Sequence, residues 1–202
     1  MQTVPVMRTI REQIVDHLRT EVLSGSYQEG DALREQHLAK RYGVSRGPIR
    51  DALLQLTKEG LLVAQANRGV KVKKRPSEKS RQLFVSMRRQ IETYALQEIF
   101  PTISAEDIAQ WDLHLEQFKE ACQQGVFSSV VQNDMAFHRS LIERVGDDDL
   151  TAVWIPLITH ILLPYSRHKN LLESYAEHRA VVAAIKKRDL KGAIAALEKN
   201  IQ

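Results

Sequence analysis

The stretch YGVSRGPIRDAL, residues 42–53, places a glycine and a proline at the start of an otherwise helical pattern. Gly47 and Pro48 fall in the first turn, where backbone N–H groups have no intrahelical partner and a proline costs little. Arg46 and Arg50 are four residues apart and project from one side of the helix. A slim, cationic helix start favours approach to phosphates or guanine edges, although a solvated helix in any bundle could carry the same residues.

The flanking segments predict a small fold around this helix. Apolar residues recur every four positions over residues 10–22 and predict a first helix, and a shorter pattern predicts a second helix that stops at Gly43. Ser45 is then the expected N-cap of the third helix. Two short strands are predicted next, at residues 60–64 and 69–73. Three helices followed by a two-stranded hairpin is the order of a winged helix-turn-helix, whose third helix enters the DNA major groove.

Length, composition and charge distribution narrow the class of protein. A chain of 202 residues forms one or two domains, and 43% hydrophobic with 27% charged residues is typical of a soluble globular protein. Short apolar runs predict no membrane segment, and the single Cys122 excludes an internal disulfide, so we expect a cytoplasmic location. Residues 1–75 contain 14 basic and 8 acidic side chains, against 15 and 17 in residues 76–202. The basic surplus of the first third indicates a polyanionic partner or a solvated basic face.

The remainder of the chain has helical periodicity throughout. A charged, proline-containing stretch without periodicity predicts a linker at residues 76–80, between a DNA-binding domain at 1–75 and an all-α domain at 81–202. Apolar stripes then predict about six helices, at residues 83–99, 104–125, 127–145, 148–166, 170–188 and 189–202. The predicted fold class is therefore mainly α, with a helical bundle for ligand binding or dimerisation after the winged domain.

Two polar residues interrupt an otherwise apolar helix of the predicted bundle. Asp134 and His138 are four residues apart and share one helix face, a spacing that suits a common metal ion but also a surface Asp–His pair. His178 lies at the start of a later helix and by itself indicates little. From spacing alone, both interpretations stay open.

The segment ALREQHLAKRYGVSRGPIRDALLQLTKEGLLVAQANRGVKV resembles the DNA-binding domain of the GntR family of bacterial transcription regulators, over almost all of residues 8–74. The family's VSR-x-P-x-R pattern is present, and the resemblance implies that Arg46 and Arg50 contact DNA. A basic residue often found after the counterpart of Glu35 is Gln36 here, which puts one contact in doubt. The expected DNA-binding residues are Gln36, Ser45, Arg46, Gly47, Pro48, Arg50 and, at the wing tip, Asn67, Arg68 and Gly69.

Residues 80–202 resemble the FCD domain, the effector domain of FadR-type members of that family. The resemblance rests on R-x-x-[LI]-E, D-x-x-x-H and EH-R elements, present at Arg88–Glu92, Asp134–His138 and Glu177–Arg179. It implies a site for a divalent cation such as zinc or nickel, with ligands Asp134, His138, His178 and Asn200. Many members have a histidine at the last position. An amide is a poorer ligand than imidazole, so a harder cation, a shell completed by water or effector, and an empty site are the alternatives.

These resemblances imply a homodimeric repressor, not an enzyme, that binds a palindromic DNA operator under the control of a small carboxylate effector. Arg88 is the expected effector-binding residue, although it could equally form a structural ion pair with a nearby acid. One alternative is a dimeric DNA-binding protein that needs no ligand. The other is a metal-dependent enzyme that would use Asp134, His138 and His178 around a metal-bound water.

Overall fold

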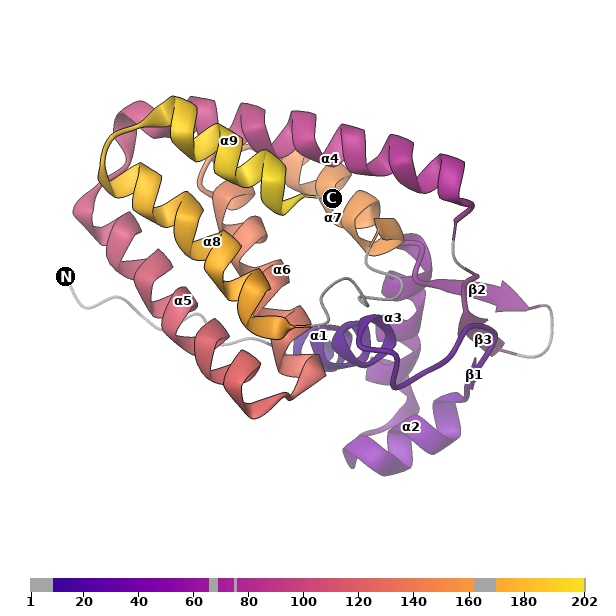
Figure 1. Ribbon diagram of the computed structural model, residues 1–202. Helices are drawn as coiled ribbons and strands as arrows, with labels where there is room; N and C mark the ends of the chain where they lie inside the picture. Colours follow the sequence, from indigo (N-terminus) through magenta and orange to yellow (C-terminus); the bar gives the residue numbers. More distant parts are fainter. Residues whose placement is uncertain (1–8, 66–68, 75, 162–169, 202) are drawn as a thin grey trace. The chain divides into compact units, whose positions relative to one another are not determined.

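The computed structural model describes residues 9–65, 69–74, 76–161 and 170–201 (Figure 1). The chain divides into two compact units, Met1–Arg75 and Pro76–Gln202. The first unit combines helices with a small sheet, and the described residues of the second form helices joined by short turns. In the described part of the chain, no helix combines the length and the apolar character that crossing a membrane requires.

Three helices form most of the first unit: α1 (Ile10–Leu23), α2 (Glu35–Tyr42) and α3 (Arg46–Lys58). Gly43 ends α2 in the left-handed conformation, at φ 65°, which glycine adopts without steric cost. Ser45 is the N-cap residue of α3, as its position in the sequence predicts. Its backbone is extended, as in other N-cap residues, but its hydroxyl makes no capping hydrogen bond.

The sheet of the first unit has three antiparallel strands in the order β1-β3-β2: β1 (Ala32–Leu33), β2 (Leu62–Gln65) and β3 (Gly69–Val72). Strands β2 and β3 form the predicted hairpin, with Gln65 opposite Gly69 at its tip. The sequence predicts a two-stranded wing, and the structure adds a third strand, β1, in which Leu33 pairs with Val70 of β3. The predicted tip residues Asn67 and Arg68 lie outside the described residues.

A buried ion pair fastens α1 to the end of α3. Arg19 donates from Nε and Nη2 to the Glu59 carboxylate at 3.0 and 2.8 Å, and both side chains are about nine-tenths buried. Ile49 and Leu56 are fully buried on the inner face of α3. The opposite side of the helix start, which carries Arg46, is therefore left facing solvent.

The second unit contains six described α-helices and one short 3-10 turn. Their bounds are α4 (Glu78–Ile99), η1 (Phe100–Thr102), α5 (Ala105–Gln124), α6 (Phe127–Glu143), α7 (Asp148–Ile161), α8 (Leu171–Lys186) and α9 (Leu190–Asn200). Ser77 caps α4 through the backbone N–H of Ser80, so most of the predicted linker 76–80 is already helical. Helix α8 packs against both α5 and α9, and α4 contacts α6, α7 and α9 (Figure 1).

The turn between α8 and α9 is tied back to the end of α4. Arg188 has a left-handed backbone (φ 56°), which is uncommon for a residue other than glycine. Its guanidinium donates to the carbonyls of Phe100 and Ile103 at 3.4 and 2.9 Å. These hydrogen bonds offset the backbone strain and close the bundle around a core that includes Phe137 and Leu197.

Candidate functional site

The start of α3 is exposed and cationic. Arg46 and Arg50 keep 63% and 66% of their side-chain surface accessible, while Pro48 is half-buried beside them. Gly47 is exposed, and the atom nearest to a Cβ built there is the Ser45 hydroxyl oxygen at 4.0 Å. A flat partner could therefore approach the backbone of this helix turn closely.

Of the other residues expected to contact DNA, Gln36 is exposed on α2 and Ser45 is exposed at the start of α3. Gly69 is exposed at the hairpin tip, with φ 83°. The structure also brings an acidic residue to the arginines, which sequence reasoning did not assign to the site. Glu35, the first residue of α2, accepts hydrogen bonds from both Arg46 and Arg50.

In the second unit, three residues from two helices form a buried cluster. Asp134 and His138 lie on α6 and His178 on α8, with exposed fractions of 4%, 0% and 0%. Their potential ligand atoms all lie within 4.8 Å of one another. Ligands at about 2.1 Å from one ion are separated by roughly 3 to 4 Å, so a small inward adjustment would suffice. The alternative of a surface Asp–His pair is wrong.

The ring of His178 is oriented by a backbone group. Its Nδ1 lies 2.7 Å from the carbonyl oxygen of Ser174, which can only accept, so Nδ1 carries a proton. The other ring nitrogen, Nε2, lies 3.2 Å from Oδ1 of Asp134. A lone pair on Nε2 and a carboxylate oxygen repel each other at this distance unless a proton or a metal ion lies between them.

His138 is oriented by a carboxylate in the same way. Its Nδ1 lies 2.6 Å from Oε2 of Glu92, whereas its buried Nε2 has no hydrogen-bond partner among the described residues. Burial lowers the pKa of His138, outweighing the Glu92 charge that would raise it, so the ring is neutral. A neutral imidazole held through Nδ1 by a carboxylate is the usual arrangement of a metal-binding histidine.

Glu92 is the centre of a buried polar network that the sequence did not disclose. Its Oε1 accepts from Nε of Arg88 at 2.7 Å and from Nε1 of Trp154 at 2.8 Å, while Oε2 faces His138. Burial by itself would raise the pKa of Glu92, but the charge of Arg88 and the hydrogen bonds from Arg88 and His138 lower it to about 2. Trp154, which is fully buried in the core, therefore also holds this acid.

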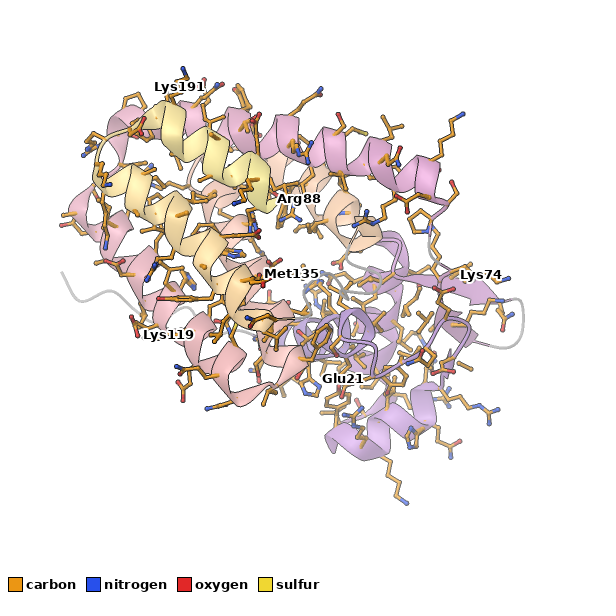
Figure 2. All side chains as sticks on the ribbon, viewed as in Figure 1. Glu21, Lys74, Arg88, Lys119, Met135 and Lys191 are labelled. Carbon is orange, nitrogen blue, oxygen red and sulfur yellow. The ribbon has the colours of Figure 1, made fainter. Side chains whose placement is uncertain are left out.

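Arg88 forms the structural ion pair that the sequence left as an alternative. The side chain is 4% exposed, and its Nη2 is buried without a hydrogen-bond partner among the described residues (Arg88 is labelled in Figure 2). Burial would raise the pKa of Asp134, but the hydrogen bond with His178 and the nearby charge of Arg88 lower it. The guanidinium thus contributes both to the Glu92 pair and to the field around the cluster.

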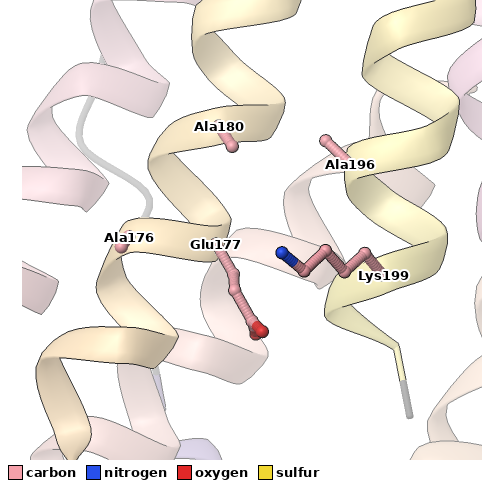
Figure 3. Close-up of a pocket in the computed structure, with 5 residues that line it drawn as sticks. All are labelled: Ala176, Glu177, Ala180, Ala196 and Lys199. Carbon is pink, nitrogen blue, oxygen red and sulfur yellow. The ribbon is translucent and has the colours of Figure 1, made fainter.

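Asn200, the fourth expected ligand, lies beside the cluster. Its Nδ2 is 3.3 Å from Nδ1 of His178 and 3.3 Å from Oε2 of Glu177. Glu177 also lines a pocket of about 200 Å³ between α8 and α9, together with Ala176, Ala180, Ala196 and Lys199 (Figure 3). Asn200 therefore contacts the edge of His178 that faces away from Asp134.

Two family matches divide the chain at the same place as its fold. Residues 10–72 match the family described as bacterial regulatory proteins, gntR family, and residues 84–202 match the FCD domain. The gluconate operon transcriptional repressor of Bacillus licheniformis is 23% identical over 93% of this chain and 80% of its own length. The transcriptional repressor RspR of Escherichia coli is 22% identical over 96% of this chain and 86% of its own length.

The solved structure of Escherichia coli McbR/YncC has the same fold. It superposes with a TM-score of 0.82 at 20% sequence identity, covering 97% of this chain and 95% of that protein.

Proposed function

The chain belongs to the GntR family of bacterial transcription regulators and contains an FCD domain, and from this premise we propose a repressor controlled by a small carboxylate. In this proposal the first unit binds an operator, and the second unit binds the carboxylate beside a divalent cation. We infer a regulator rather than an enzyme, because the relatives are named as regulators and the DNA-binding unit would otherwise have no role. Such a protein meets its operator in the cytoplasm.

The exposed arginines at the start of α3 support operator binding. Arg46 and Arg50 lie on one side of a helix start that is narrow enough for close approach to DNA. Replacing either by alanine should weaken binding to a duplex selected from a random pool by about 1–3 kcal/mol, or roughly 5- to 150-fold. Arg11→Ala, which removes an exposed arginine from α1, is the matched control. An equal loss of affinity in all three variants would mean that the arginines of α3 contribute only their positive charge.

The observation that carries the sensing function is the pair His178 Nε2 and Asp134 Oδ1, 3.2 Å apart with a proton or a metal ion required between them, beside an unpartnered His138 Nε2. Asp134, His138 and His178 would hold a divalent cation, and Asn200, the fourth residue of the expected set, would lie against the Nδ1 edge of His178 and help to hold that ring in place. The cation would supply positive charge with open positions that a carboxylate can occupy. A measurement of metal content identifies the ion as zinc, nickel or another divalent cation.

Metal content tests this assignment directly. Elemental mass spectrometry of protein purified without chelator should find about one equivalent in the wild type and a strong loss in His138→Ala. His114→Ala is the matched control, because His114 lies half-buried on α5 outside the cluster. Equal metal content in the three proteins would show that the cluster holds no ion.

Arg88 is the proposed second anchor for the carboxylate, through the Nη2 group that has no other partner among the described residues. Arg88→Lys keeps a cation beside Glu92 but removes the planar donor pair, so it should weaken the response to effector and leave operator affinity intact. A response of wild-type strength in this variant would eliminate the role. Thermal shift with a carboxylate library identifies the effector class, because a ligand stabilises the state that binds it.

The exposed face of α4 supports a homodimer on a palindromic operator. Leu83, Met87 and Tyr94 keep 59%, 39% and 50% of their surface accessible on this face, and its other exposed positions from 82 to 97 carry no charge. Val153 adds a further exposed apolar side chain (58%) on the contacting helix α7. A two-fold interface sets the same patch against itself, so an uncharged apolar surface suits a second copy of this chain.

A further inference from the structure

We infer that Glu35 is a positioning residue that sets the specificity of DNA recognition, by holding Arg46 and Arg50 in one arrangement and by neutralising part of their charge. The inference rests on the proposed operator binding and adds to it a residue that touches no DNA itself. Its basis is a single carboxylate on α2 shared by two guanidinium groups on α3.

The contacts leave the recognition edge of Arg46 available. Nε and Nη2 of Arg46 donate to Oε2 of Glu35 at 3.3 and 2.8 Å. A guanidinium bound through this side edge keeps both N–H groups of Nη1 and one of Nη2 for another acceptor. This is the end-on pair that guanine O6 and N7 accept, so Glu35 and a base can be bound together.

Arg50 is held from the same carboxylate, more loosely. Its Nε lies 3.3 Å from Oε1 and its Nη2 lies 3.5 Å from Oε2. Long exposed side chains lose up to about 2 kcal/mol of rotamer freedom when a contact fixes them. Because Glu35 restricts both arginines before DNA arrives, part of that cost is met in the free protein.

The charge of Glu35 has a second consequence. The hydrogen bonds of Arg46 and Arg50 lower the pKa of Glu35, so the group is ionised and the local balance is two cations against one anion. Phosphates attract the pair less than they would two free arginines, and this attraction is the sequence-independent part of DNA binding. A base edge that fits the arginines in this arrangement loses less binding free energy than the phosphates do. Glu35 therefore favours the cognate sequence over other sequences.

The test compares two duplexes of equal length: one selected from a random pool by the full-length protein, and one of random sequence. Affinities are measured against salt concentration. Glu35→Gln should bind the random duplex more tightly, with a salt slope steeper by about 0.9, as expected for one more phosphate neutralised. Its preference for the selected duplex should fall about tenfold, as expected when one good base contact is lost.

Two further variants separate position from charge. Asp51→Asn removes an equal charge from an exposed site on α3 that forms no hydrogen bond or ion pair with either arginine among the described residues, and should retain the preference for the selected duplex. Glu35→Asp keeps the charge but shortens the reach, and should retain the salt slope while losing preference. If Glu35→Gln behaves as Asp51→Asn does, Glu35 is only one of several surface charges and the inference fails. If no duplex is enriched at all, the proposed operator binding fails, and the inference with it.

Discussion

Replacing Glu92 by alanine would leave three buried donors, on Arg88, His138 and Trp154, without their shared acceptor. Glu92 and Arg88 are 0% and 4% exposed, so water cannot replace the lost carboxylate without opening the bundle. Removing one partner of a buried ion pair costs about 3–5 kcal/mol. The pKa of Glu92 is lowered from 4.5 to about 2, which means that the folded state stabilises the ionised acid. This agrees in sign with a loss of stability when the acid is removed.

Tryptophan fluorescence during urea unfolding isolates this effect. The chain has two tryptophans, Trp111 and Trp154, and both lie in the second unit. With a slope of about 2 kcal/mol per M, a loss of about 4 kcal/mol lowers the urea midpoint by about 2 M. Metal-free protein avoids any contribution from a bound ion. Glu92→Gln keeps one acceptor oxygen and should fall between wild type and alanine.

Glu98→Ala is the control, because Glu98 is exposed on the same helix and should change stability by less than about 0.5 kcal/mol. A midpoint shift below about 0.5 M for Glu92→Ala would refute the reasoning. It would mean that the three donors find other acceptors and that the network does not support the bundle.

Two further outcomes are expected. Leu83→Glu sets like charges against each other across the proposed interface and should give a monomer by light scattering, whereas Leu113→Glu, on the exposed face of α5, should remain dimeric; a dimer in both would contradict the interface. The hydrogen bond from Arg144 lowers the pKa of Asp107 against burial, so its stabilisation is present above the ordinary pKa of 3.8 and is lost as pH falls. Asp107→Asn should therefore cost about 1 kcal/mol at pH 7 and almost nothing near pH 2, and a cost independent of pH would exclude the ion pair.

The parts of the fold that sequence reasoning predicted are those with local causes. Gly43 ends α2 and Pro48 lies in the first turn of α3. Both effects come from the residue's own backbone conformation and need no distant partner. Strand β1 has no signal in the sequence, because it is only two residues long and becomes a strand through its pairing with β3. The last residues of the predicted linker are helical because Ser77 caps α4, a signal weaker than the charged stretch around it.

The candidate site divides in the same way. Asp134 and His138 share a face through helix periodicity alone, whereas the approach of His178 comes from packing of α8 on the bundle. The roles of Glu92 and Glu35 depend on contacts between residues 46 and 11 positions apart, which spacing along the chain does not encode. A fully buried glutamate such as Glu92 indicates a paired or functional group, because charged side chains are rarely buried without a partner. Its burial is known only once the fold is known.

The central claim is that the buried cluster of the second unit controls DNA binding by the first. The most direct measurement is the affinity of the full-length protein for its selected duplex, without metal, with metal, and with metal plus the carboxylate found by thermal shift. Wild type should change affinity by roughly 5- to 150-fold on addition of the carboxylate, the usual range of coupling between two sites. His138→Ala should show no change. Affinity that is the same under all conditions, or a response that persists in His138→Ala, would contradict the account.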